Sequence, residues 1–398
     1  MSRLGPWGGR RIAVAVSGGP DSLALALLTH DWCRAHDRAM IALTVDHGLR
    51  PEAAGEARDV ASLMAANQIP CHILTIPDLA RGSALPARAR DARYQALFAA
   101  CHQAGIIDLL LGHHTRDQAE TLLMRRARSS GPSGLAAMAA VSVRDGIRLV
   151  RPLLATSHDT LRAELRARCI AWIDDPSNRD QRATRARIRA GLDGTAIEAL
   201  AAQAKTAGRA RTETEIATAT WLAQNAIIRP EGFAYLLTGA CPAESLTALI
   251  QTIGGLAYPP PSASIARLAG KLRAATLAGV RIIRHDGKFV LLREQSAIAP
   301  PVPAEQNTVW DQRFRVLEPG HLSPDATIGV LGTDAARLRD LSDLPAAILA
   351  TLPAIRSGTD LPHVPFLPAN HLNPDTGAVL RFNPPRPAAG ALFRAVDN

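Results

Sequence analysis

The sequence predicts an α/β fold in which a doubly wound parallel sheet precedes a long connecting helix and a smaller C-terminal α/β region. Up to about residue 150, short apolar runs of strand length alternate with longer stretches of helical periodicity. This βαβα order is typical of a parallel sheet with helices on both faces. Such sheets bind ligands at the carboxyl ends of their strands, so we expect the functional residues in the loops there.

The expected elements follow one another closely. Strands are expected at residues 11–16, 40–45, 72–76, 107–111 and 147–154. Helices are expected at residues 22–36, 52–67, 86–103, 117–128, 158–169 and 181–191. An alanine-rich stretch with few helix breakers, residues 195–225, predicts the connecting helix.

The pattern changes in the C-terminal part. Residues 245–252 and 265–274 predict short helices, and two strands at 280–284 and 288–292 flank a hairpin turn at His285-Asp286-Gly287. Residues 299–304 (APPVPA) predict a linker. The stretch that follows is rich in proline and glycine, and we assign it no structure.

Composition places the chain among cytoplasmic proteins. No run of about eighteen apolar residues exists that could span a membrane. The five cysteines are scattered, odd in number and never spaced C-x-x-C, which argues against a disulfide framework, a structural zinc site or a redox pair. The sequence leaves the oligomeric state open between a monomer and a homodimer.

The charge of the chain has two interpretations. A net charge of +9 suits a polyanionic partner such as RNA, but an arginine-rich composition also follows from a GC-rich genome. The distribution of lysines is more informative. None precedes Lys205, so phosphate-binding, kinase-type and Schiff-base lysines are excluded from the N-terminal half.

The strongest motif is SGGPDS at residues 17–22, between the first expected strand and the first expected helix. Gly18 and Gly19 let backbone N–H groups approach an anion, and the helix N-terminus adds its dipole. Ser17 and Ser22 can donate hydroxyls to phosphate, while Asp21 can help to hold Mg²⁺. The plainer interpretation, a turn and helix start around Pro20, does not explain its place directly after a buried strand.

Two further motifs lie at the same expected sheet edge. Asp46 and His47 follow the second strand, where they can reach a nucleotide or serve only as polar loop residues. The third motif, LGHHTRDQAET at residues 111–121, follows the fourth strand. Asp117 and Glu120 share a helix face there, so they form either an acidic pocket for a cation or a routine acidic helix start.

These motifs resemble a known family. SGGPDS is similar to the SGGxDS loop of the PP-loop ATP pyrophosphatases, which adenylate a carbonyl and release pyrophosphate. With its other motifs, the chain resembles the tRNA(Ile)-lysidine synthetases over residues 11–192. The matching segments are residues 45–50 (VDHGLR), 89–94 (ARDARY), 111–121, 128–135 (RSSGPSGL), 151–154 (RPLL), 172–178 (WIDDPSN) and 185–189 (RARIR).

The resemblance implies a ligase reaction with ATP and Mg²⁺. C2 of the wobble cytidine in a CAU-anticodon tRNA(Ile) is adenylated, and the ε-amine of free L-lysine displaces AMP, so that the tRNA reads AUA. Asp21, Arg93, Asp117 and Glu120 are the implied catalytic residues, with Asp117 and Glu120 binding lysine and Arg93 facing the activated base or phosphate. The nucleotide would be bound by Ser17, Gly18, Gly19, Pro20, Asp21, Ser22, Asp46 and His47. The implied tRNA contacts are Arg128, Arg182, Arg185, Arg187 and Arg189, which could otherwise form one solvated helical face.

The implied organisation has three parts. Residues 1–192 form the PP-loop ATP-binding catalytic domain, residues 193–298 the connecting helix and a small tRNA-binding α/β domain, and residues 299–398 a proline-rich linker and a C-terminal tRNA-recognition region. Deleting residues 226–398 is expected to spare ATP binding and weaken tRNA selection. The sequence departs from the family pattern at Pro86, Arg116, Ser129 and Ala186.

Three alternatives stay open at this point. A PP-loop enzyme that thiolates tRNA shares the first loop but typically needs catalytic or cluster-binding cysteines. A PP-loop ligase of small molecules would leave the arginine-rich segment unexplained. A non-enzymatic tRNA-binding module would not need Ser17, Asp21 and Ser22.

Overall fold

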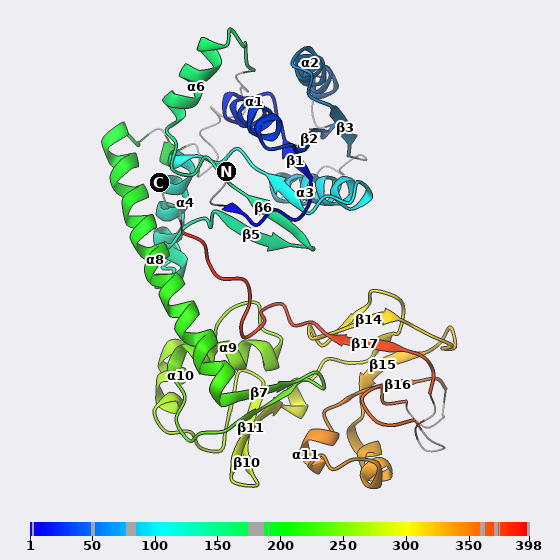
Figure 1. The fold of residues 1–398 in the computed structure, drawn as a ribbon. Helices are drawn as coiled ribbons and strands as arrows, with labels where there is room; N and C mark the ends of the chain where they lie inside the picture. Colours follow the sequence, from blue (N-terminus) through cyan, green and yellow to red (C-terminus); the bar gives the residue numbers. More distant parts are fainter. Residues whose placement is uncertain are drawn as a thin grey trace. The chain divides into compact units, whose positions relative to one another are not determined.

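The protein forms two compact units, unit 1 (Met1–Glu213 with Ala391–Asn398) and unit 2 (Thr214–Gly390). Unit 2 is therefore inserted in the sequence between two parts of unit 1, and Figure 1 shows both ends of the chain in unit 1. The computed structural model describes residues 1, 4–48, 52–76, 85–173 (Pro86 by its backbone alone), 187–189, 191–358, 363–369, 373 and 375–395. The predicted domain boundaries at residues 192 and 298 stay predictions.

Unit 1 is built on a six-stranded sheet of order β3-β2-β1-β4-β6-β5. The strands are β1 (Arg11–Ala15), β2 (Ala39–Asp46), β3 (Cys71–Thr75), β4 (Asp108–Leu110), β5 (Val141–Arg144) and β6 (Ile147–Val150). All neighbours pair in parallel except β5, which is antiparallel to β6. The chain winds outward from β1 in one direction through β2 and β3 and in the other through β4, so the topological switch point lies between β1 and β4.

Helices cover both faces of this sheet, as predicted. On one face lie α1 (Pro20–Ala35), α2 (Ala53–Ala66) and α6 (His158–Ala167), and on the other lies α3 (Leu85–Gln103). Helix α4 (Thr115–Ala127) packs instead with α5 (Pro132–Leu135) and α8 (Gly194–Asn225). Ile12 and Val14 of β1 pack in one core with apolar residues of α1, α2 and α6, whereas Ala13 packs in another with residues of α3 such as Phe98. Successive strand residues point to opposite faces, so these two cores are the two layers of the doubly wound fold.

The predicted helices and strands of unit 1 lie within a few residues of the observed ones. Helix α1 begins at Pro20, a favoured first helical residue, and carries Asp21 in its first turn and Arg34 in its last, which complements the helix dipole. The strand predicted for residues 147–154 ends at Val150. Of the helix predicted for residues 181–191, the structure describes residues 187–189 as helical and residue 191 as a turn; the remainder lies outside the described residues.

Unit 2 contains a five-stranded sheet of order β7-β8-β11-β10-β9 and two three-stranded sheets, β12-β15-β16 and β13-β14-β17. The strands of the first sheet are β7 (Ala226–Arg229), β8 (Phe233–Leu236), β9 (Ala275–Leu277), β10 (Val280–His285) and β11 (Lys288–Arg293). The others are β12 (Val302–Pro303), β13 (Val309–Trp310), β14 (Phe314–Glu318), β15 (Thr327–Val330), β16 (Pro353–Arg356) and β17 (Val379–Phe382). Helices α9 (Ala243–Gly254), α10 (Ser262–Ala269) and α11 (Ala346–Leu349) and the 3-10 segments η3 (Gln295–Ala297) and η4 (Gly332–Leu341) complete the unit.

The hairpin predicted in unit 2 is present. Strands β10 and β11 pair antiparallel, with His285 opposite Lys288, and the two turn residues Asp286 and Gly287 have φ values of 48° and 75°. Two positive φ values match the primed turn that suits twisted hairpins. The segment predicted as a linker contains β12, because Val302 pairs with Ile328 of β15.

A buried cluster of charges stabilises unit 2. The Asp311 carboxylate accepts hydrogen bonds from Arg293 Nε at 3.0 Å and from Arg313 Nε at 2.8 Å, and from the backbone N–H of Ala299 at 3.0 Å. Both Asp311 and Arg313 are buried. Burial lowers the pKa of Arg313 to about 10, although the charge of Asp311 acts in the opposite direction. The cluster joins β11 to the turn before β14 through charges that are largely removed from water.

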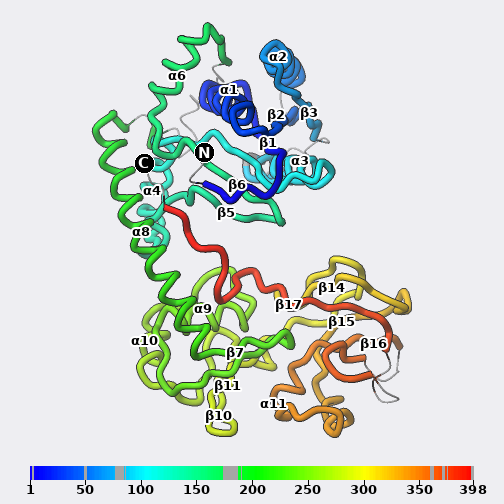
Figure 2. Tube along the Cα trace, viewed as in Figure 1, coloured from blue at the N-terminus to red at the C-terminus, as the bar shows by residue number. Residues whose placement is uncertain are grey.

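The last described residues return to unit 1. Residues 391–395, which we call the return segment, follow β17 and run beside the N-terminal segment and α8, in red in Figure 2. The carbonyl of Arg394 accepts a hydrogen bond from Ala140 N at 2.9 Å, and its guanidinium donates to the carbonyl of Gly5 at 2.9 Å. In the part of the chain that the structure describes, no helix has the length and apolarity needed to cross a membrane.

Candidate active site

The SGGPDS loop connects β1 to α1, and the hydroxyl oxygens of Ser17 and Ser22 lie 3.3 Å apart. Ser17 N donates to Ser22 Oγ at 3.1 Å, and Ser22 Oγ donates to the carbonyl of Gly19 at 3.0 Å. Gly18 has a φ of 81°, and a Cβ there would lie 2.9 Å from Ile173 Cδ1. Only glycine combines this backbone conformation with so close a neighbour. The loop is thus held open in a shape whose N–H groups can face an anion.

The loop after β4 packs directly against the start of α1. A Cβ built on Gly112 would lie 3.1 Å from both Ser22 Cα and Ser22 N. This close approach joins the first and third sequence motifs at the β1/β4 switch point, where open α/β sheets bind ligands. The prediction that these motifs share one edge of the sheet is therefore met by their geometry.

Asp21 lies between two histidines from other helices. His114 Nε2 is 3.5 Å from Asp21 Oδ2, and His158 Nε2 is 3.8 Å from Asp21 Oδ1. Asp21 Oδ1 is buried and has no hydrogen-bond partner. Burial raises the pKa of Asp21 above its usual value, although both histidines act in the opposite direction, and burial lowers the pKa of His158. The Asp21 carboxylate thus has an oxygen ready for a cationic ligand.

Helix α4 begins with a capping box that involves the same histidine. The backbone N–H of His114 donates to Asp117 Oδ2 at 3.0 Å, and Arg116 N donates to His114 Nδ1 at 3.3 Å. Because Nδ1 accepts a hydrogen bond, the neutral imidazole carries its proton on Nε2. This nitrogen lies 3.6 Å from Asp117 Oδ2 as well as beside Asp21. His114 thus fixes the start of α4 and directs one N–H group toward both carboxylates.

Glu120 lies one turn further along α4 and is completely buried. Arg189 Nε donates to Glu120 Oε1 at 2.7 Å and Arg189 Nη2 to Glu120 Oε2 at 3.5 Å. Burial alone would lower the pKa of Arg189, but the hydrogen bond and charge of Glu120, with the charges of Asp117 and Asp21, raise it. Arg189 therefore lies within the acidic site that α1 and α4 form.

Arginines gather around one tyrosine of α3, and we call Arg90, Arg93, Arg144 and Arg151 the Tyr94 arginine cluster. The guanidinium carbons of Arg90, Arg93 and Arg144 lie 5.3, 5.7 and 5.3 Å from the centroid of the Tyr94 ring. Burial lowers the pKa of Arg93 and of Arg151, and each has a buried Nε without a hydrogen-bond partner. Such incompletely paired cations favour an anionic ligand.

The chain is similar to known proteins over most of its length. The family model of the PP-loop domain matches residues 2–194 of this chain. The protein is 37% identical to a tRNA(Ile)-lysidine synthase of Ruegeria pomeroyi, and the match covers 90% of this chain and 88% of that one. The corresponding enzyme of Mesorhizobium japonicum is 36% identical over 84% of this chain and 79% of its own, and that of Brucella suis 35% identical over 90% and 86%.

The chain belongs to the tRNA(Ile)-lysidine synthase family. The fold class, the family and the enzyme class predicted from the sequence, a ligase, are thereby confirmed. The PP-loop domain is an ATP-binding domain, which implies ATP as the nucleotide of this chain.

The other predicted site residues lie apart from Asp21 and the start of α4. Asp46 ends β2, next to β1, where its Oδ1 accepts a hydrogen bond from Gly48 N at 3.0 Å, and His47 follows it. Arg128 is exposed at the C-terminal end of α4, about 16 Å along the helix from Asp117. Arg187 is exposed, unlike its neighbour Arg189.

Part of the predicted tRNA contact set, Arg182 and Arg185, lies outside the described residues, as does Ala186. Of Pro86 only the backbone is described. Residues 174–178 of the WIDDPSN segment are also outside them, whereas Trp172 and Ile173 are described, and Ile173 N donates to the Gly18 carbonyl at 3.0 Å. That segment therefore begins at the SGGPDS loop.

His158 was not among the predicted site residues, although its position in the sequence carries a signal. His158 is the first residue of α6, after the N-cap Ser157, and the preceding strand β6 is a neighbour of β4. A polar residue at a helix start beyond the carboxyl end of a central strand is well placed for a ligand site. Arg162, one turn further on, also acts on the pKa of both Asp21 and His158.

Proposed function

We propose that this enzyme attaches lysine to the wobble cytidine of a CAU-anticodon tRNA(Ile) in the cytoplasm. The cytidine C2 oxygen attacks the α-phosphorus of ATP, and pyrophosphate leaves. The ε-amine of lysine then attacks C2, a proton passes from the amine, and AMP leaves with the oxygen. The observation that carries this proposal is the contact of Gly112 with Ser22, because it sets the ATP loop against the acidic start of α4.

The SGGPDS loop would bind the ATP phosphates. Its backbone N–H groups, the start of α1 and the Ser17 hydroxyl would supply donors, and Ser22 would do so once its bond to the Gly19 carbonyl is released. Asp46 and His47 border the same edge. Mg²⁺ would be held by Asp21, whose buried oxygen without a hydrogen-bond partner fits a hard cation, and would neutralise charge on the phosphates. This arrangement suits a chain without a lysine in its N-terminal half.

Lysine would bind beside Asp117 and Glu120. Both carboxylates are buried near the first turns of α4, where a cationic amine gains from charge complementarity that water does not screen. We propose that Asp117 also accepts the proton of the attacking amine, since it lies next to the Asp21 carboxylate and hence to the phosphates. Positioning of this kind can supply much of the acceleration without a covalent intermediate on the protein.

The tRNA would meet two groups of arginines. The Tyr94 arginine cluster offers incompletely paired cations and an aromatic face, with Arg93 next to the activated base or its phosphate. The exposed Arg128 and Arg187, with Arg182 and Arg185, would contact the backbone elsewhere. Unit 2 would select the isoleucine tRNA against the methionine tRNA that shares its anticodon.

The main rival is thiolation of a tRNA base. A reactive thiol needs a lowered pKa. Burial instead raises the pKa of Cys33, Cys71 and Cys101 to about 11 and that of Cys241 to about 12. Four of the five thiols are therefore poor nucleophiles, which favours an amine as the attacking group.

The deciding experiment measures incorporation of labelled lysine into unmodified CAU tRNA(Ile), with the methionine tRNA as control. ATP- and Mg²⁺-dependent labelling of the isoleucine tRNA alone is the expected result. If AMP forms when tRNA is added but no lysine is incorporated, the proposal that lysine is the nucleophile is wrong, while the adenylation step remains supported. In that case, sulfide donors and other amines are tested as the nucleophile.

A pair of carboxylate variants tests the ATP site. Asp21→Asn should reduce AMP formation by about 10²–10³-fold, the usual size of a lost electrostatic stabiliser. Asp159→Asn is the matched control, because the Asp159 side chain is 98% exposed and next to His158. Equal activities of the two variants would contradict the role of Asp21.

A further inference from the structure

We propose that the return segment is a positioning element of the catalytic site, acting through residues 138–140 on α4 and on Arg151. This inference rests on the proposed function, because α4 carries the lysine-binding carboxylates. Phe393 and Arg394 are the positioning residues. They belong to unit 1 although more than 170 residues of unit 2 precede them in the sequence.

The return segment is bound on three sides. The Arg394 carbonyl accepts from Ala140 N at 2.9 Å, and its guanidinium donates to the carbonyls of Gly5 at 2.9 Å and Leu4 at 3.4 Å. The Phe393 carbonyl accepts from Thr212 Oγ1 at 2.7 Å. These bonds connect the return segment to Leu4 and Gly5, to α8, and to residues 138–140, which precede β5 and which we call the strip.

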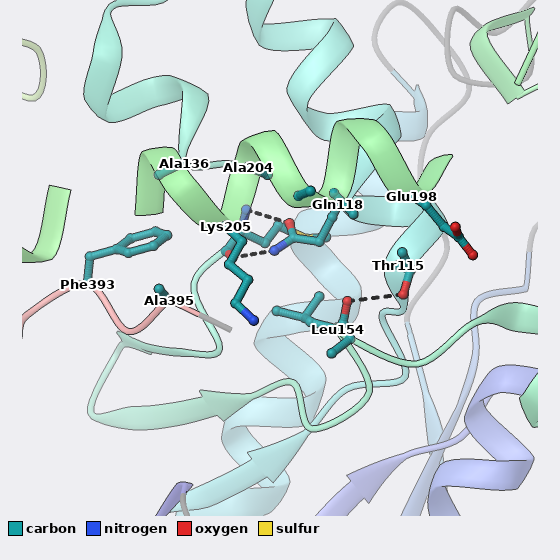
Figure 3. Close-up of a pocket in the computed structure, with 13 residues that line it drawn as sticks. Thr115, Gln118, Ala136, Leu154, Glu198, Ala204, Lys205, Phe393 and Ala395 are labelled. Carbon is teal, nitrogen blue, oxygen red and sulfur yellow. Dashed lines mark hydrogen bonds between the residues drawn. The ribbon is translucent and has the colours of Figure 1, made fainter. Parts of the chain in front are cut away.

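The Phe393 side chain is packed as tightly as a core residue. It is 6% exposed, and the Arg211 guanidinium lies 4.5 Å from its ring centroid. A Cβ built on Gly208 would lie 3.0 Å from Phe393 Cε1, so a glycine of α8 makes room for the ring. The ring forms one wall of a pocket of about 300 Å³ that Met138 also lines. Lys205 lines the same pocket (Figure 3).

Residues 138–140 connect the return segment to α4. Gln118 Nε2 donates to the Met138 carbonyl at 2.9 Å, and Met138 N donates to Gln118 Oε1 at 2.8 Å, as the dashed lines in Figure 3 show. Gln118 is buried and directly follows Asp117 in the helix. A shift of Met138 therefore moves the turn of α4 that carries the acidic pair.

The same strip holds Arg151 of the Tyr94 arginine cluster. Arg151 N donates to the Ala140 carbonyl at 2.8 Å, and Arg151 Nη1 donates to the Ala139 carbonyl at 3.0 Å. Ala140 thus lies between Arg394 on its N–H side and Arg151 on its carbonyl side. The strip has no helix or strand hydrogen bonds of its own, so its position depends on these partners.

The test compares Phe393→Ala with Leu392→Ala in the full-length chain. Leu392 is the matched control because it is the preceding residue of the same segment and is 41% exposed. We expect Phe393→Ala to raise KM for lysine between about threefold and thirtyfold, the range of couplings transmitted through packed residues. The affinity for tRNA should stay unchanged, and Leu392→Ala should behave as the unaltered enzyme. A Phe393→Ala variant with normal KM for lysine would overturn the proposal.

Hydrogen exchange provides a readout that does not depend on the reaction. The amides of α4 should exchange faster in Phe393→Ala than in Leu392→Ala, while those of α2 stay unchanged. Unaltered protection of α4 would reject the positioning role even if lysine proves not to be the substrate. If Phe393→Ala unfolds, Thr212→Val, which removes one hydrogen bond to the segment, replaces it in both measurements.

A peptide tests the segment in isolation. In a chain that ends at Gly390, a peptide of residues 386–398 should restore the low KM for lysine, and the same peptide with Phe393→Ala should not. Failure of the first peptide with a folded chain would count against the proposal. Deletion of residues 226–398 removes this segment as well as unit 2, so a deletion that keeps residues 391–398 is needed to isolate tRNA selection.

Discussion

Arg189 holds the buried carboxylate of Glu120 with two hydrogen bonds, of 2.7 and 3.5 Å. Both residues were expected in binding roles, Glu120 for lysine and Arg189 for tRNA, yet they contact each other. A lysine ammonium that enters this site meets a Glu120 carboxylate that is already paired with the Arg189 guanidinium. The pair therefore sets how much negative charge α4 offers to its substrate.

Replacing Arg189 tests this relationship. Arg189→Ala should destabilise unit 1 by about 2 kcal/mol, the usual size of a lost hydrogen bond to a charged group. It should also change KM for lysine, because Glu120 would lose the two donors that hold it in place. Thermal unfolding and lysine-dependent AMP release are the measurements.

The control for this change is Arg187→Ala, on the same short helical turn but exposed. It should weaken tRNA binding and reduce its salt dependence, with no effect on KM for lysine. The proposed division of roles would be wrong if both variants altered only the affinity for tRNA.

The Tyr94 arginine cluster predicts a graded effect on RNA binding. Arg144 is 45% exposed and pairs with Asp91 at 3.3 Å, so Arg144→Ala should lower tRNA affinity modestly and reduce the salt slope by about one. Arg93→Ala should in addition abolish adenylation. Arg34→Ala, at the opposite end of α1 from the SGGPDS loop, serves as the control. The measurement is titration with tRNA at several salt concentrations. Equal tRNA affinities and salt slopes for Arg34→Ala and Arg144→Ala would contradict a tRNA-binding role of the cluster.

The thiols should react at very different rates. Cys169 is exposed, whereas Cys33, Cys101 and Cys241 are buried with pKa values of about 11, 11 and 12. Because the thiolate is the reactive form, a group with a pKa of 11 has about one thiolate in a thousand at pH 8, rising tenfold with each pH unit below the pKa. A disulfide reagent should therefore show one fast phase, which Cys169→Ser removes. A fast phase retained in that variant would contradict the burial of Cys33, Cys101 and Cys241 or the raised pKa of the half-buried Cys71.

Asp311 should be critical for unit 2. Asp311→Asn would leave Arg293 and Arg313 without their buried counter-charge, at a cost of about 3–5 kcal/mol. Asp286→Asn is the matched control, since Asp286 is 84% exposed and asparagine also tolerates its positive φ. Urea unfolding should separate the two variants, while ATP binding by unit 1 persists in both. Similar urea midpoints for the two variants would show that the charge cluster contributes little to the stability of unit 2.

Local signals explain why unit 1 could be predicted. Its elements are long, begin with residues such as Pro20 and alternate regularly, and its motifs lie directly beside them. Strand β5 was missed although Asp145 and Gly146, with φ values of 51° and 75°, form the same kind of turn that was recognised at residues 286–287. A strand of four residues, 141–144, gives too short an alternation to be noticed without that turn.

Long-range contacts explain what could not be predicted. Strand β14 pairs with β17, so Phe314 lies opposite Phe382 although more than sixty residues, including β15, α11 and β16, separate them in the sequence. No local pattern encodes such a pairing. The contact of Arg189 with Glu120 and that of Arg394 with Ala140 are likewise set by tertiary packing. Residue identity suggested a role for Arg189, but only the fold shows the carboxylate it meets.

The insertion of unit 2 into unit 1 also orders events during translation. The SGGPDS loop leaves the ribosome early, but the return segment follows only after all of unit 2. At about 5–20 residues per second, the roughly 370 residues between the two take about 20–70 seconds to synthesise. A nascent chain that stalls in between holds its ATP loop while the strip beside α4 lacks Arg394. Under the roles proposed above for the return segment and for unit 2, catalytic competence would be delayed until the unit proposed to select the tRNA has been synthesised.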